Sequence, residues 1–156
     1  MGFPRVSVQF LASTLHWIGI LAYGGVLVVF ALLLPLGGRL RGLQPWHLDR
    51  VFRACGPISG LGLGTLLVGG FLRLWLVRGS FSWNLDILLA KHLVLFVLWV
   101  SYTILEIWTL EPLRRLDSGD TPSDVSGYLS ARCRVVRHVQ VNAALLLLVL
   151  FLGLAG

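Results

Sequence analysis

Four long apolar stretches limit what this chain can fold into. They cover residues 8–34, 57–77, 85–108 and 139–155, and mean hydropathy over the whole chain is +0.84. A helix of about 17–25 apolar residues crosses a hydrocarbon core of about 30 Å. Residues 143–152 are apolar on every face, whereas a strand of a membrane barrel alternates polar and apolar side chains. We therefore predict an all-α integral membrane protein, a four-helix bundle forming a single domain over residues 1–156.

Local signals refine the helix limits. Ser123 is of the residue type that caps helix N-termini, so the fourth helix is expected over 123–155. The polar, basic linker 39–54 is expected to form a short helix on the membrane surface. Gly60 and Gly64 form a GxxxG pattern in the second helix, which favours close helix packing.

The distribution of positive charge predicts the orientation. The formal net charge is +6, and nine of the thirteen Lys and Arg residues fall in the first and third connections or the polar start of the fourth helix: Arg39, Arg41, Arg50, Arg53, Arg114, Arg115, Arg132, Arg134 and Arg137. Basic loops stay in the cytoplasm, so both termini are expected on the outer side. Basicity of this kind does not point to nucleic acid. Glu106 and Glu111 are expected to be solvated or to pair with Arg114 or Arg115.

Two histidines lie inside the apolar stretches. At 1.5 Å per residue, His16 falls about 12 Å and His92 about 10 Å from the start of their segments. Both segments enter from the outer side, so the imidazoles are expected at one depth, where ionisable groups are functional by default. Gly19 and Tyr23 follow His16 on one helical face, and Lys91 points about 100° away from His92.

The paired histidines predict a cofactor. Two imidazoles at one level can ligate a haem iron, and Arg73, Arg78 or Lys91 on the same side could neutralise its propionates. We therefore predict that His16 and His92 bind haem b or a similar metal cofactor. Such a protein would exchange electrons with quinone or a respiratory complex. The sequence leaves open whether it forms a homo-oligomer.

A second, weaker metal candidate lies towards the cytoplasmic side: His47, Cys55, Cys133 and His138. Cysteine and histidine suit a soft metal, but no CxxC, HxxH or HxxxH spacing is present. Copper(I) prefers thiolate or thioether ligands, and Met1 is the only methionine. The composition is therefore poorly suited to copper transport.

Three short motifs resemble the CopD family of bacterial inner-membrane proteins: Leu15-His16-Trp17 running into Tyr23-Gly24-Gly25, Leu88-Leu89-Ala90-Lys91, and Arg137-His138-Val139-Gln140-Val141-Asn142 before a run of leucines. The resemblance implies a bacterial cytoplasmic membrane protein that takes up or delivers copper beside a periplasmic copper protein.

A more distant resemblance is to the HemJ family of membrane protoporphyrinogen oxidases, which pair a histidine in the first helix with a lysine in a later one. By this resemblance, His16 and Lys91 would be the matching positions. The alternatives to haem binding are therefore copper handling, an oxidase, and a structural subunit that docks into a larger complex.

Overall fold

The structure is a computed structural model that describes residues 5–37, 39, 44–77, 85–116 and 122–155. Side chains are described for residues 8–37, 39, 44–72, 90–116 and 122–152. Within these ranges the chain is helical apart from short turns and contains no strand. The prediction of an all-α protein is confirmed for this part of the chain.

The long helices contain several local changes of helical type. In chain order the elements are α1 (Arg5–Gly19), the π-turn η1 (Ile20–Gly24), α2 (Gly25–Leu33), the 3-10 turn η2 (Leu34–Leu36), α3 (Pro45–Ala54), α4 (Gly56–Val77), α5 (Leu85–Ile104), the π-turn η3 (Leu105–Thr109), α6 (Glu111–Leu116) and α7 (Val125–Ala155). The predicted short helix in the 39–54 linker is α3. The first helix is continuous from α1 to η2, because Pro35 lies in the first turn of η2, where no N–H is needed.

Among the described residues, three helices are long and apolar enough to cross a membrane: Val8–Leu36, Ala90–Leu116 and Val125–Leu152. The pair formed by α3 and α4 passes the same criterion as a unit bent by 43°. Helices of this length and hydropathy indicate a helical membrane protein; in the described ranges they number three, or four if the bent pair forms one span.

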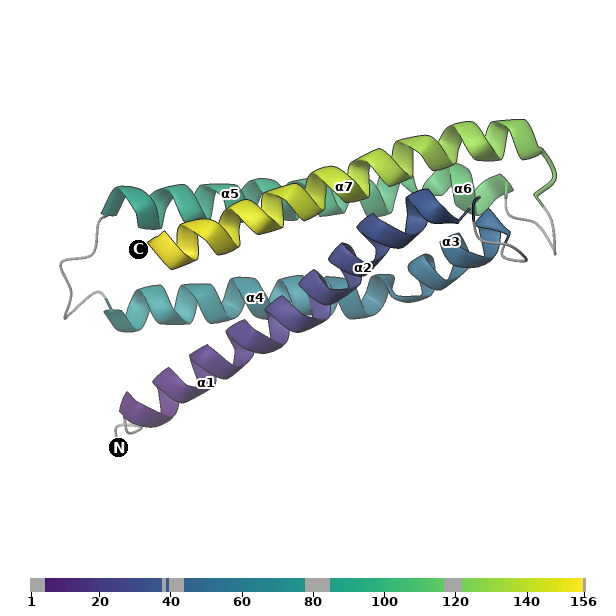
Figure 1. Cartoon of the computed structure of the whole chain (residues 1–156). Helices are drawn as coiled ribbons and strands as arrows, with labels where there is room; N and C mark the ends of the chain where they lie inside the picture. Colours follow the sequence, from purple (N-terminus) through teal and green to yellow (C-terminus); the bar gives the residue numbers. More distant parts are fainter. Residues whose placement is uncertain (1–4, 38, 40–43, 78–84, 117–121, 156) are drawn as a thin grey trace.

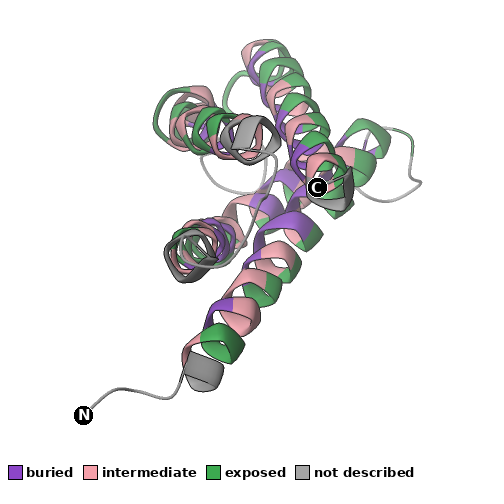
Figure 2. Cartoon of the chain, turned by 90° about the vertical axis from the view of Figure 1, so that its left-hand side faces the viewer, coloured by how far each residue is buried: buried purple, intermediate pink, exposed green. Residues whose placement is uncertain are grey.

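The long helices lie side by side in two packed pairs. Figure 1 shows the start of α1 and the end of α7 at one end of the molecule, which we call the terminal end, and α3 and α6 at the other, the α3 end. The most extensive contacts join α1 to α4 and α5 to α7. The core between these pairs includes Leu66 of α4, Leu98 of α5 and Val139 of α7, while exposed residues lie on the outward sides of the helices (Figure 2).

The cap of α7 differs from the sequence prediction by one residue. Asp124, rather than Ser123, precedes the helix and accepts hydrogen bonds from the Gly127 N–H (3.0 Å) and the Ser126 hydroxyl (2.9 Å). The bond from the Gly127 N–H, followed by that from Ser126, holds the pKa of the Asp124 carboxyl below its ordinary value. Both residue types cap helices well, so composition alone did not identify the capping position.

Glycines allow α1 and α4 to touch along their backbones, but the predicted pair does not make this contact. A Cβ on Gly62 would lie 2.5 Å from the Tyr23 nitrogen, and one on Gly19 would lie 2.5 Å from the Leu66 nitrogen. By contrast, nothing described lies within 4 Å of a Cβ on Gly64, and Gly60 faces Tyr102 of α5. The close packing expected of segment two is present, through different glycines.

Candidate functional site

The α1–α4 contact fixes the position of His16. A Cβ on Gly69 would lie 2.8 Å from the backbone nitrogen of His16 and 3.1 Å from the carbonyl oxygen of Ala12. Any larger residue at this position would separate the helices here. The His16 backbone is therefore held directly against α4, about halfway between the start of α1 and the buried Tyr23.

His92 reaches the same level of α4 from another side. Its ring lies 6.0 Å from that of Phe71, centroid to centroid. Gly69 and Phe71 are two residues apart, which corresponds to about 3 Å along the helix axis. Between them, Gly70 has no described atom within 4 Å of the place where a Cβ would stand. The two histidines thus flank one level of α4, on either side of an open glycine.

The other residues predicted to line this site lie in different surroundings. Gly19 is pressed against the backbone of Leu66, so α4 fills the space that a ligand would need there. Tyr23 is fully buried deeper in the core and packs edge-to-face against Tyr102, with ring centroids 5.7 Å apart. Lys91 is half-buried beside His92 on α5.

Two predicted cations cannot be compared with the structure. The side chain of Arg73 lies outside the described side chains, although its backbone belongs to α4. Arg78 lies wholly outside the described residues.

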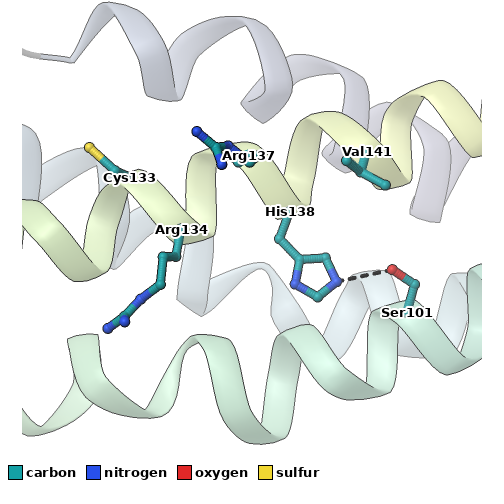
Figure 3. Close-up of a pocket in the computed structure, with 6 residues that line it drawn as sticks. All are labelled: Ser101, Cys133, Arg134, Arg137, His138 and Val141. Atoms are coloured by element: carbon teal, nitrogen blue, oxygen red, sulfur yellow. Dashed lines mark hydrogen bonds between the residues drawn. The ribbon is translucent and has the colours of Figure 1, made fainter.

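Towards the α3 end, His138 lies between two hydroxyl groups. Its Nε2 is 3.0 Å from Ser101 Oγ of α5, and its Nδ1 is 3.0 Å from Thr109 Oγ1 of η3 (Figure 3 draws the Ser101 bond). Thr109 also donates to the carbonyl oxygen of Ile104 (3.4 Å). Both ring nitrogens of His138 are engaged.

The weaker metal candidates do not form a metal-binding group of three in the described part of the chain, although Cys133 and His138 line one pocket. No group of three His, Cys, Asp or Glu residues placed to bind a metal occurs there. His47 is exposed on α3, where its ring lies 6.2 Å from that of Trp46. Cys55 and Cys133 are free thiols, the first half-buried and the second exposed.

A buried ion pair at the α3 end was not predicted from the sequence. Arg132 Nε of α7 donates to both carboxylate oxygens of Asp49 in α3, at 3.1 and 2.9 Å, and the Tyr128 hydroxyl donates to the same carboxylate at 2.7 Å. Arg132 Nη2 also donates to the Leu34 carbonyl oxygen at 2.5 Å. The Asp49 and Arg132 side chains are only 3% and 11% exposed. This cluster, the Asp49–Arg132 clamp, joins the first helix, α3 and α7.

Two polar side chains deep in the core have no hydrogen-bond partner among the described residues. These are the amide of Asn142, 0% exposed, and the hydroxyl of Tyr23. An unsatisfied buried polar group is costly, and more so where surrounding lipid excludes water.

Replacing Asn142 with leucine should therefore stabilise the fold. We expect Asn142→Leu to raise the free energy of unfolding by about 1–3 kcal/mol, the desolvation penalty of an unsatisfied amide. Thermal unfolding in a mild detergent would measure the change, with Gln140→Leu on the exposed side of α7 as the control. A clear loss of stability would mean that the folded protein provides partners for the amide, such as bound water.

Comparisons with known proteins give no relative. No family model, curated protein or solved structure matches this chain. Any function is therefore argued from the chain's own residues.

Proposed function

We propose that the chain is a four-helix protein of a bacterial cytoplasmic membrane, with both termini outside. In this arrangement the bent α3–α4 pair supplies the remaining span. The proposal is supported by the basic residues, nine of which cluster in the sequence segments around η2, α3, α6 and the start of α7. By the positive-inside rule this end faces the cytoplasm. His16 and His92 then belong to the outer half.

Within this membrane protein, we propose a binding site for haem b or a similar metal cofactor between α1, α4 and α5. The observation that supports it is the sequence of three neighbours on α4: Gly69 against His16, the open Gly70, and Phe71 against the ring of His92. Two histidines at one level, separated by a glycine with space beside it, suit a flat ligand held from both faces.

The residues would have separate roles in such a site. His16 and His92 would hold the haem iron, and the neighbouring Lys91 would neutralise a propionate. When bound, a haem of this kind supplies one-electron transfer, and quinone or a respiratory partner would be the electron donor or acceptor. The close α1–α4 contact would fix the backbone of His16 and so limit the movement of this ligand.

The test is an absorption spectrum of the full chain purified in detergent, before and after haem reconstitution. We expect a Soret band typical of low-spin, two-histidine ligation. His16→Ala and His92→Ala should each lower haem affinity at least about tenfold. Even the substitution of a residue that only hydrogen-bonds to a metal ligand usually costs about this much. His47→Ala, exposed on α3, should bind as the parent does. Thermal unfolding without haem would confirm that each variant folds.

Three results would overturn haem binding. The first is the absence of a Soret band after reconstitution, and the second is unchanged haem affinity in both variants. The third is copper in the purified protein, lost in both variants and without haem, which would favour the CopD-like alternative. Oxidation of protoporphyrinogen that depends on His16 and Lys91 would instead favour the HemJ-like alternative. Unchanged assembly and activity in every variant would favour a structural subunit.

A further inference from the structure

A pocket opens between α5 and α7, away from the proposed cofactor site. Its volume is about 370 Å³, and it is lined by Ser101, Cys133, Arg134, Arg137, His138 and Val141. Figure 3 shows Arg134 and His138 pointing from α7 towards the helix that carries Ser101, while Arg137 points from another side of α7. The pocket lies where the basic start of α7 gives way to its hydrocarbon part.

The two pocket arginines differ from others at this end of the molecule. Arg132 pairs with Asp49. The predicted carboxylate pairs are confirmed, with Arg114 on Glu106 and Arg115 on Glu111, each at 2.9 Å. In the described part of the chain, Arg134 and Arg137 have no acidic partner, and both are exposed. Although the two side chains leave α7 on different sides, residues three apart are neighbours on a helix surface, and both arginines line the same pocket.

The polar wall of the pocket is already hydrogen-bonded within the protein. His138 is fixed between the hydroxyls of Ser101 and Thr109, so its nitrogens are not free to select a ligand. The two arginines are therefore the side chains that would bind a ligand in this pocket. Their forked donors match the paired oxygens of a phosphate.

The surface beyond the arginines is apolar. Val141 and Leu148, one above the other on α7, are 50% and 44% exposed. On α5, Val97 lies one turn from Ser101 and is 44% exposed. An occupant that fills the pocket and follows this surface needs an anionic head and a hydrocarbon tail. A small soluble anion would leave the apolar part uncovered.

We propose that this pocket binds the phosphate of an anionic phospholipid, whose acyl chain lies over Val141 and Leu148. Basic pockets between membrane helices on the cytoplasmic side are suited to lipid headgroups, and each arginine near the surface contributes about a fivefold gain in affinity. Bound lipid would join α5 and α7 at the membrane boundary, where Ser101 and His138 already connect them.

The experiment measures lipid binding to the full chain in neutral detergent by native mass spectrometry. Short-chain phosphatidylglycerol should bind more tightly than phosphatidylcholine of the same chain length. Arg134→Gln and Arg137→Gln should each weaken phosphatidylglycerol binding about fivefold, and together they should abolish the preference. Arg115→Gln is the matched control, because this exposed arginine already pairs with Glu111. Thermal unfolding in phosphatidylcholine should be unchanged in all variants.

Competition with sodium phosphate distinguishes a lipid headgroup from a soluble phosphate compound, since both carry the same phosphate group. If the occupant is a lipid, millimolar inorganic phosphate should not displace phosphatidylglycerol. Displacement at low concentration would overturn the lipid proposal in favour of a soluble phosphate compound. Equal binding of both lipids, or equal losses in Arg115→Gln and the pocket variants, would also overturn it. None of these outcomes depends on whether the outer histidines bind haem.

Discussion

Asp49→Ala should lower the free energy of unfolding by about 3–5 kcal/mol, the cost of removing one partner from a buried ion pair. The substitution leaves the Arg132 guanidinium, 11% exposed, without its carboxylate, and it removes the acceptor of the Tyr128 hydroxyl. Thermal and denaturant unfolding in detergent would measure the loss. Glu111→Gln, which breaks the exposed Arg115 pair, should change stability by less than about 1 kcal/mol.

The double variant Asp49→Leu with Arg132→Met tests whether the fold needs the ion pair itself or only the packing of the two side chains. An apolar pair of similar volume can replace a buried ion pair with little loss. We therefore expect the double variant to recover much of the stability that Asp49→Ala loses. If Asp49→Ala were as stable as the parent, the clamp would not contribute to the fold.

Gly62→Ala is the second change with a large expected effect. The new methyl group would lie 2.5 Å from the Tyr23 nitrogen and 2.8 Å from the Ala22 Cβ, so α1 and α4 must move apart. Overpacking of this kind costs about 1–3 kcal/mol, and a backbone neighbour gives way less easily than a side chain. Unfolding in detergent should show the loss, and a larger one for Gly62→Val.

Gly64 provides the control on the same helix. Nothing described lies within 4 Å of its added Cβ, so Gly64→Ala should leave stability unchanged or raise it by up to about 1 kcal/mol through helix propensity. The two substitutions therefore have opposite expected signs. Equal effects would mean that the α1–α4 contact is not made as described.

The helices could be predicted from hydropathy, but their rotation could not. Apolar length located α4 and α5 closely, since this signal needs no partner. Of the GxxxG pair, Gly60 lies against Tyr102 of α5 and Gly64 meets no described atom, because a spacing does not show which side of a helix meets a neighbour. Gly62 and Gly69, seven residues apart, face α1 instead.

Part of the candidate site could not be predicted from the sequence either. Equal depth of His16 and His92 was predicted by counting residues, and both flank one level of α4. The π-turn η3, by contrast, has no composition signal, although it brings Thr109 to His138. The clamp joins Asp49 to Arg132 across 83 residues, a separation at which no local pattern operates.

That separation has a consequence for synthesis of the protein. At about 5–20 residues per second, a ribosome needs roughly 4–17 s to pass from Asp49 to Arg132. Throughout this interval Asp49 has no Arg132 to neutralise it, and an isolated carboxylate stays in water rather than enter lipid. We therefore expect α3 to dock against the bundle through Asp49 only after Arg132 has been synthesised.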